Sequence, residues 1–321
     1  MKRRDFVRTT LGATLLNPFE ALEKPEVTYL ESEDLTGQAK LADGYALNFM
    51  AVGDWGRNGE FLQLEVGKTM GQWASKNRNN FIISVGDNFY PKGVISEHDP
   101  LWHYSFENVY TAYSLQCDWY SILGNHDYMS DPDAQIRYSA ISRRWKMPAR
   151  YYSHEVPIGK TGGKLLLVMI DSNKMIFEAD REEAQKQIEW INAALSNVSP
   201  DVKWKMVVGH HPYYTVGPRI SNYETLAIRA ALAKTFEKHQ VDVYLSGHEH
   251  SIQHLKPEGY THQFISGAGS EISTVTSGVS YSKFQAAENG FLYFSLDNNR
   301  MNVKAINQAG TVLYETELRK A

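Results

Sequence analysis

The chain has 321 residues, of which 42% are hydrophobic and 12% aromatic, and a formal net charge of −4 at pH 7. This composition is typical of a globular protein, and it argues against a disordered chain and against a basic surface for nucleic acid. The single cysteine, Cys117, excludes an internal disulfide and a cysteine-based zinc site. No apolar run approaches the roughly 20 residues of a membrane-spanning helix, and no linker divides the chain.

The N-terminus has the features of a targeting segment. Arg3, Arg4 and Phe6 form an Arg-Arg-x-Phe pattern ahead of the mildly apolar run 9–16, which resembles a twin-arginine export signal. The apolar run is short, so a merely basic start is the alternative. We expect residues 1–25 to be an export signal and the protein to be periplasmic or secreted, although a cytoplasmic location stays open. The remainder, residues 26–321, is expected to form one domain.

The first part of the chain has the pattern of a strand, a helix and a second strand. Residues 47–52 and 81–85 are apolar strand candidates, and the helical spacing of apolar residues predicts a helix over 60–76. Each strand ends at a glycine followed by an aspartate, Asp54 or Asp87. The crossover between parallel strands is right-handed, so both carboxylates are expected at the same edge of the sheet.

The middle of the chain adds an aromatic-rich segment and a hairpin. We expect residues 97–113 to be helical and 119–123 to form a third strand that leads to Asn125. Residues 151–156 and 164–170 are expected to pair as a hairpin. The glycine-lysine run in its turn lacks the residue order of a phosphate-binding loop.

The second half begins with helices and ends with strands. Capping-box patterns at Asp180 and Ser221 predict the starts of two helices, and the strands 204–208 and 241–246 each run into Gly-His. Further strands follow with no helix between them, at 263–266, 290–296, 302–306 and 311–315. A parallel first part and an antiparallel tail predict an α/β fold, a four-layer α/β/β/α sandwich of two mixed sheets flanked by helices.

Five predicted strand ends place a metal-binding residue type directly after a glycine. These residues are Asp54, Asp87, Asn125, His210 and His248, and Tyr90 and His250 follow closely. One Gly-Asp turn alone would mean little, because aspartate is common in turns. Together the seven residues are of the types that bind two hard or borderline cations. The other histidines carry no such pattern and are interpreted as surface or core residues: His98, His103, His154, His239, His254 and His262.

The ordered motifs resemble the signature of the metallophosphoesterases. In chain order they are Gly53-Asp54, Gly86-Asp87-Asn88-Phe89-Tyr90, Gly124-Asn125-His126-Asp127, Gly209-His210 and Gly247-His248-Glu249-His250. The tyrosine three residues after the second aspartate makes the chain similar to the small, tartrate-resistant purple acid phosphatases, over about residues 49–250. The resemblance implies a calcineurin-like fold and an acid phosphatase that hydrolyses phosphate monoesters by attack of a metal-bound hydroxide.

The same resemblance implies two metal ions. The first would be held by Asp54, Asp87, Tyr90 and His250. The second would be held by Asp87, Asn125, His210 and His248, with Asp87 as the bridge. A phenol gives up its proton at acidic pH only to a strong Lewis acid, so Tyr90 indicates Fe(III), while the second site suits a divalent ion, Fe, Zn or Mn.

The resemblance also implies a general acid, His126, but it does not decide which residues contact the substrate. His126 is expected to protonate the leaving group, and Asp127 either orients it or is purely structural. The small purple acid phosphatases carry another histidine in a longer loop after the fourth motif, whereas residues 213–219 contain none. Arg219 can bind a phosphate oxygen instead, and His211 either lines the pocket or packs.

The expected substrate is a small phosphate ester. Nucleic acid is not expected as a partner, no membrane-spanning segment is expected, and the chain is expected to be a monomer. Metal ligands alone do not choose between mono- and diesters, so a phosphodiesterase or nucleotide hydrolase on the same dimetal core is the main alternative. A non-catalytic phosphate-binding protein is disfavoured by the complete ligand set. A redox role for an iron pair is a third alternative.

Overall fold

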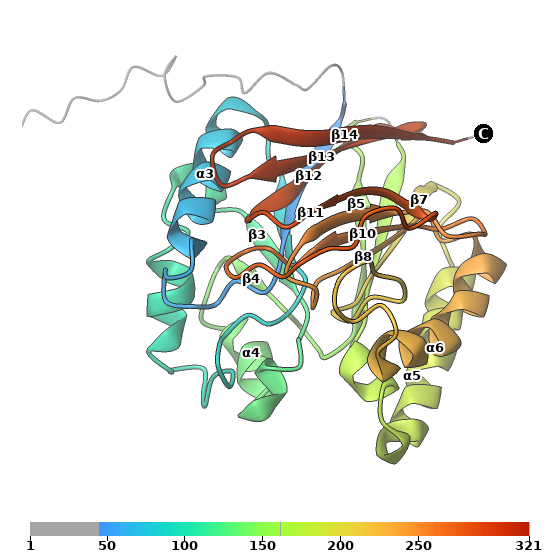
Figure 1. The fold of residues 1–321 in the computed structure, drawn as a ribbon, viewed down its shortest axis with the longest axis horizontal. Helices are drawn as coiled ribbons and strands as arrows, with labels where there is room; N and C mark the ends of the chain where they lie inside the picture. Colours follow the sequence, from blue (N-terminus) through green and yellow to red (C-terminus); the bar gives the residue numbers. More distant parts are fainter. Residues whose placement is uncertain (1–44, 161, 321) are drawn as a thin grey trace, which may run out of the picture. The chain divides into compact units, whose positions relative to one another are not determined.

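The computed structural model describes residues 45–320 apart from Thr161, and the predicted export signal over residues 1–25 lies outside the described residues. Two seven-stranded mixed sheets pack face to face, and helices cover their outer faces (Figure 1). The predicted four-layer α/β/β/α sandwich is therefore confirmed.

The elements have the following bounds. The first sheet contains β1 (Leu47–Val52), β2 (Phe81–Ser84), β3 (Asp118–Ser121), β4 (Trp145–Lys146), β12 (Gly290–Leu296), β13 (Arg300–Asn307) and β14 (Val312–Arg319). The second contains β5 (Tyr152–Pro157), β6 (Lys164–Met169), β7 (Val202–Val208), β8 (Val243–Ser246), β9 (Ile252–Leu255), β10 (His262–Ser266) and β11 (Ser282–Ala286). The α-helices are α3 (Gln63–Lys76), α4 (Asp133–Tyr138), α5 (Arg181–Ser196) and α6 (Tyr223–His239).

Parallel pairing explains where the site forms. In the first sheet β1, β2 and β3 are neighbours and run parallel, and in the second sheet β6, β7 and β8 do the same. The carboxyl ends of parallel neighbours lie at one edge of a sheet, which is where α/β proteins bind ligands. The loops after these strands carry the predicted ligands, and the predicted parallel pairing of the first two strands is confirmed.

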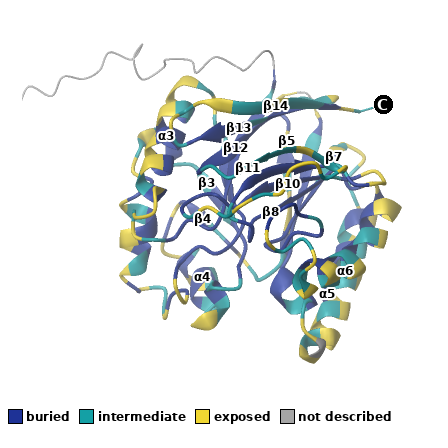
Figure 2. Cartoon of the chain, viewed as in Figure 1, coloured by how far each residue is buried: buried dark blue, intermediate teal, exposed yellow. Residues whose placement is uncertain are grey.

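The strand β6 shows how the layers are held together. Its residues Leu165 and Leu167 lie in the core between the two sheets. Leu166 and Val168 lie on the other face and pack in a second core together with apolar residues of α5 and α6. A strand that is buried on both faces needs a continuous apolar run instead of an alternating pattern. Figure 2 shows this distribution, with buried strands in the middle and exposed outer faces on α5 and α6.

The first predicted helix begins later than its apolar spacing indicates. We expected it over residues 60–76, but α3 begins at Gln63. Asn58, Phe61 and Leu62 have φ angles of 58°, 52° and 65°, in the left-handed region that a helix cannot contain. The backbone therefore turns sharply before the helix starts.

The helix predicted over residues 97–113 is wrong. Only a short π-helix, Trp102–Glu107, forms there. Just before it, the Asp99 carboxylate accepts hydrogen bonds from the backbone N–H groups of Ile95 and Leu101, which gives the backbone an alternative to helical pairing. Within this segment Trp102, Phe106 and Val109 are buried and the ring of Trp102 stacks on that of Tyr138, whereas Tyr113 is 91% exposed.

Both predicted capping boxes differ from the structure. At α5 the Asp180 side chain makes no cap hydrogen bond, because it accepts one from Lys174 Nζ at 3.0 Å. At α6 the cap is Asn222, one residue after the predicted Ser221, and its side chain accepts from the backbone N–H of Glu224. The short elements α4, β4, β9 and β11 were not predicted from the sequence.

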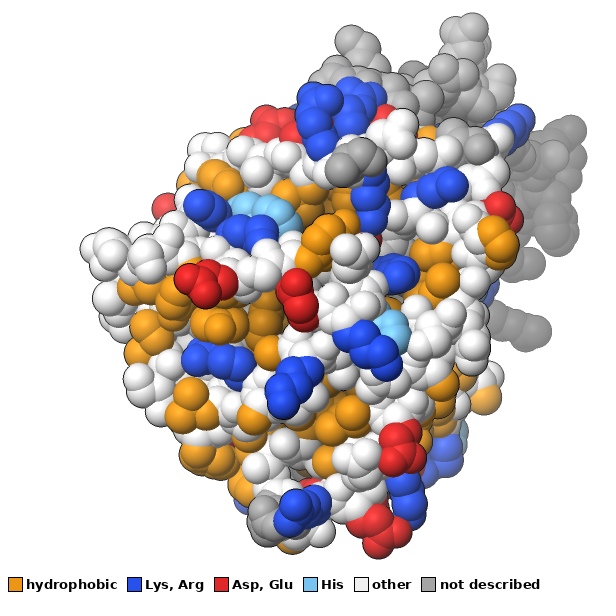
Figure 3. Space-filling view, turned by 90° about the vertical axis from the view of Figure 1, so that its right-hand side faces the viewer, with side chains coloured by type: hydrophobic (Ala, Val, Ile, Leu, Met, Phe, Trp, Pro, Cys, Tyr) orange, Lys and Arg blue, Asp and Glu red, His pale blue; other side chains and the backbone are white. Residues whose placement is uncertain are grey.

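The surface of the described residues is mixed in character. On the face shown in Figure 3, lysine and arginine side chains are scattered among acidic and apolar ones and do not form one continuous patch. Among the described residues, no helix combines the length and the apolar character that crossing a lipid bilayer requires.

Candidate metal centre

Three of the predicted ligands have an unusual backbone conformation. Asp54, Asp87 and His248 have φ angles of 57°, 50° and 67°. Such left-handed conformations in residues other than glycine cost about 1–3 kcal/mol each and concentrate at functional sites. Gly86 is required by close contact, because a Cβ there would lie 2.7 Å from His210 Nδ1 and 2.8 Å from the backbone nitrogen of Gly124.

The first group of predicted ligands converges around the Tyr90 hydroxyl. That oxygen lies 2.8 Å from Asp87 Oδ2, 3.3 Å from Asp54 Oδ1 and 3.2 Å from His250 Nε2. His250 Nε2 is also 3.4 Å from Asp54 Oδ1. Two carboxylate oxygens, a phenol and an imidazole nitrogen thus face one point, contributed by loops from both sheets.

The second group converges around His210. Its Nε2 lies 3.2 Å from Asn125 Oδ1 and 3.5 Å from Asp87 Oδ1. Its Nδ1 donates to the carbonyl oxygen of Val85 at 2.8 Å, so Nε2 is the nitrogen that can bind a metal. The ring of His248 lies 5.1 Å from that of His210, measured between centroids.

Asp87 belongs to both groups. Its Oδ2 accepts from Tyr90, while its Oδ1 faces His210 and accepts from the backbone N–H of His126 at 2.9 Å. The carboxylate is buried, with 2% of its surface exposed. One oxygen directed to each group is the arrangement that a carboxylate needs to bridge two cations.

The charges in the cluster compensate one another. Burial alone would raise the pKa of Asp87, but the facing imidazoles, chiefly that of His210, lower it below its usual range. Burial would likewise lower the pKa of His210, yet Asp87 and Asp54 raise it to about 9. The pKa of Tyr90 is raised well above 10 by burial and by the charges of the same two aspartates. Without a cation, the phenol therefore keeps its proton.

Two further buried imidazoles of the cluster, those of His248 and His211, are neutral. Burial, together with the charge of a neighbouring histidine, lowers the pKa of both His248 and His211 well below 6.5. His211 Nδ1 lies 2.9 Å from Ser172 Oγ, while its Nε2 is buried without a hydrogen-bond partner among the described residues. A neutral imidazole with an unpartnered nitrogen fits a cation or a ligand, since a buried polar atom otherwise costs free energy.

His126 lies at the open side of the cluster. Its Nδ1 contacts the carbonyl oxygen of Pro91 at 2.7 Å, its Nε2 lies 4.0 Å from Asp87 Oδ2, and its side chain is 31% exposed. Asp127 has a different task, because its carboxylate accepts backbone N–H groups from Gly124 and two residues of the preceding motif, Asn88 and Phe89. Of the two roles left open for Asp127, these contacts favour the structural one.

Glu224 is a site residue that sequence reasoning missed. Its Oε2 lies 2.9 Å from His248 Nε2, so Nδ1 is the nitrogen of His248 that remains to bind a metal. Arg219 supports this contact: it donates to the carbonyl oxygen of His248 at 3.1 Å and lies 4.0 Å from Glu224 and 3.5 Å from Glu249. In the sequence, Glu224 is indistinguishable from an ordinary acidic residue in the first turn of a helix.

The donor set fits two metal ions. Candidate ligand atoms of Asp54, Asp87 and His210 lie within 4.8 Å of one another, and so do those of His210, His211 and His248. Oxygen-rich and imidazole-rich donors suit hard and borderline cations, and partners such as Glu224 that hold an imidazole in place are typical of metal sites.

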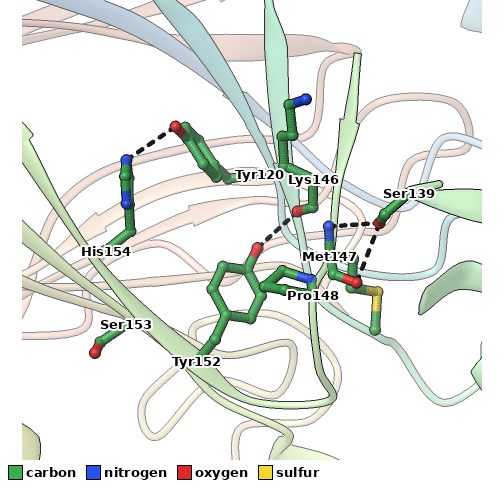
Figure 4. Close-up of a pocket in the computed structure, with 8 residues that line it drawn as sticks. All are labelled: Tyr120, Ser139, Lys146, Met147, Pro148, Tyr152, Ser153 and His154. Carbon is green, nitrogen blue, oxygen red and sulfur yellow. Dashed lines mark hydrogen bonds between the residues drawn. The ribbon is translucent and has the colours of Figure 1, made fainter. Parts of the chain in front are cut away.

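A separate pocket of about 300 Å³ lies where β3 and β4 meet β5 (Figure 4). Tyr120 and His154 are hydrogen bonded across it, and the hydroxyl of Tyr152 donates to the carbonyl oxygen of Lys146. None of the predicted metal ligands is among its lining residues.

Comparisons with known proteins agree with this geometry. Residues 47–251 match the family model of the calcineurin-like phosphoesterases. The chain is 32% identical to purple acid phosphatase 17 of Arabidopsis thaliana over 85% of this chain and 84% of that relative. It is 31% identical to tartrate-resistant acid phosphatase type 5 of Oryctolagus cuniculus, over 85% and 91% of the two chains.

Solved structures support the fold. GAP50, the anchor in the inner membrane complex of Plasmodium, matches with a TM-score of 0.76 at 23% identity, over 86% of this chain and 89% of that one. The purple acid phosphatase PPD1 from yellow lupin matches with a TM-score of 0.65 at 14% identity, over 85% of this chain and 53% of that one. With this fold, this cluster and these relatives, the chain belongs to the purple acid phosphatases within the calcineurin-like phosphoesterases and is a dimetal acid phosphatase.

Proposed function

We propose that the protein hydrolyses phosphate monoesters at a centre of one Fe(III) ion and one divalent ion, Fe, Zn or Mn. The observation that carries this proposal is Asp87, whose two oxygens face two separate groups of ligand atoms. Asp54, Tyr90 and His250 would complete the Fe(III) site. The divalent site would take Asn125, His210 and His248.

The chemistry of the tyrosine supports the ferric assignment. Because burial and two carboxylates raise the pKa of Tyr90 well above 10, only a strong Lewis acid would bind it as a phenolate at acidic pH. Two ions bound at these sites would lower the pKa of a water molecule held there and would place positive charge near the phosphate oxygens. The neutral amide of Asn125 and the neutral imidazole of His248 suit the ion of lower charge.

The chain itself would supply the proton for the leaving group. The Pro91 carbonyl holds His126 through Nδ1, which leaves Nε2 to carry a proton to the ester oxygen. The side chain is partly exposed, so a substrate can reach it. A positioned general acid of this kind contributes about 10² to 10⁴ in rate.

The predicted substrate contacts of Arg219 and His211 remain proposals. The Nε2 atom of His211 has no partner among the described residues, which supports a position facing the phosphate. Arg219 already contacts Glu224, Glu249 and the backbone of His248, so we expect it to act chiefly through that loop.

A direct test compares p-nitrophenyl phosphate with bis-p-nitrophenyl phosphate as substrates of the metal-loaded protein at acidic pH. We expect the monoester to have the higher kcat/KM. A preference for the diester would replace the proposal with a phosphodiesterase on the same dimetal core. No hydrolysis by a protein that contains both ions would favour a phosphate-binding protein.

We further propose that the protein acts as a monomer outside the cytoplasm. The basic pattern around Arg3 and Arg4 supports export. Cell fractionation of the wild type and of a variant with both arginines replaced by lysine tests this. Retention of the variant alone in the cytoplasm is expected, and equal distribution of both proteins would contradict it.

A further inference from the structure

Arg57 lies directly against the predicted ferric ligand Tyr90. Its guanidinium carbon is 3.8 Å from the centre of the Tyr90 ring, in the loop that follows β1 and carries Asp54. The Nη2 atom of Arg57 forms an ion pair with Glu271 at 2.5 Å, and Glu271 in turn lies 3.9 Å from His250 Nδ1. A cation and its counterion thus pack on the outside of two predicted ligands of one site.

This arrangement differs from the other arginine–aromatic contacts of the molecule. Arg229 lies over Tyr214 at the same 3.8 Å, Arg144 over Phe106 at 4.4 Å, Arg300 over Tyr45 at 4.9 Å and Arg150 over Tyr128 at 5.4 Å. These four arginines pack on rings outside the predicted ligand set. Arg57 Nε is buried and has no hydrogen-bond partner among the described residues, so the face of the Tyr90 ring is a principal contact of this cation.

We propose that Arg57 is a positioning residue that sets the electron density of the Tyr90 phenolate, and thereby the energy of charge transfer from the phenolate to the ferric ion. This inference rests on the proposed Fe(III) assignment. A positive charge over the ring stabilises electrons on the phenolate, and moving an electron to the metal takes it away from that charge. Arg57 therefore raises the energy of charge transfer from the phenolate to the ferric ion. Removing Arg57 shifts the visible absorption band of this charge transfer to longer wavelength.

The experiment measures the visible spectrum and the metal content of four purified proteins: wild type, Arg57→Met, Arg57→Lys and Arg150→Met. We expect the band of Arg57→Met to move to longer wavelength at unchanged iron content. Arg57→Lys keeps the charge and should lie between Arg57→Met and the wild type. Arg150→Met also loses an arginine that contacts a tyrosine ring, but it should leave the band in place.

The outcomes separate this inference from the proposed function. A coloured wild type with an unmoved band in Arg57→Met overturns the inference and leaves the ferric assignment intact. A colourless wild type that contains both metals overturns both. A third outcome is that Arg57→Met loses iron, whereas Arg57→Lys keeps its iron and has the same band as the wild type. This outcome also overturns the inference, because Arg57 would then stabilise the site without changing the charge-transfer energy.

Discussion

The second sheet carries two clusters of histidines that differ in their surroundings. At the metal centre, His210 lies beside Asp87, and the carboxylates raise its pKa to about 9. In the other cluster, His254 of β9 lies with Nε2 3.0 Å from Nδ1 of His262 on β10, and its own Nδ1 lies 3.0 Å from the Tyr314 hydroxyl. Burial and neighbouring positive charges lower the pKa of His254 to about 3 and that of His262 to about 4.

The difference shows what turns buried histidines into a metal site. Imidazoles that pair with each other and with a tyrosine satisfy their own hydrogen bonds and stay neutral. Imidazoles that share a loop cluster with two buried aspartates leave carboxylate and imidazole ligand atoms facing one another, which is an arrangement that a cation can bind. The buried carboxylates, and Asp87 above all, are thus the feature that distinguishes the metal centre from the His254–His262 pair.

Removing the shared carboxylate should have the largest effect. In Asp87→Asn both ions lose a charged ligand, so we expect activity to fall by at least about 10⁴-fold, the upper end of what a single proton donor contributes. Metal analysis should find both sites depleted. Asp242→Asn, which alters a buried aspartate outside the cluster, should keep its metals. An Asp87→Asn protein with two bound ions would refute the bridging role.

Replacing the predicted general acid, His126, should lower the activity less than Asp87→Asn does. His126→Asn should lower kcat by about 10² to 10⁴ without loss of metal, and the loss should be greatest for alkyl esters, whose leaving groups need a proton most. Steady-state kinetics over a series of esters measures this. The matched control is His154→Gln in the pocket of Figure 4. An equal loss for aryl and alkyl esters would argue against proton donation.

The partner of His248 should have a smaller effect. Glu224→Ala should weaken the binding of one of the two ions by about 10- to 100-fold, the usual cost of losing a carboxylate that holds a metal-binding histidine. Glu224→Gln keeps an acceptor oxygen and should lose less. Competition with a chelator gives the affinities, and Glu182→Ala on the surface of α5 is the control. Unchanged affinity of both ions in Glu224→Ala would contradict the assignment.

The other cluster should affect only stability. The folded-state pKa of His262 lies below that of the unfolded chain, so the unfolded chain binds more protons between about pH 6.5 and 4. The contribution of neutral His262 to the free energy of unfolding is therefore fully present above pH 6.5 and is lost as the pH falls towards 4. In His262→Gln, the slope of unfolding free energy against pH in this window should decrease by up to about 1.4 kcal/mol per pH unit. Urea unfolding at matched metal content measures the slope, and an unchanged slope would contradict the account.

The ligand cluster was predictable because each ligand stands in a short motif at the end of a predicted strand. Asp54, Asp87 and Asn125 needed only the parallel order of three strands to be brought together. Arg57 and Glu224 were not predictable, because their roles depend on which side chains of distant loops they meet after folding. The same limit applies to the short strands and to the π-helix, where tertiary packing and side-chain hydrogen bonds outweigh local propensity.

The most direct test of the dinuclear centre is the visible spectrum of the purified protein with metal analysis, repeated on Tyr90→Phe. We predict a broad visible band in the wild type that is lost in Tyr90→Phe while a trivalent and a divalent ion are still bound at one each per chain. Such a result would establish the phenolate–iron bond. A colourless, active wild type that carries two divalent ions would contradict the ferric site and place the protein with divalent-metal phosphoesterases.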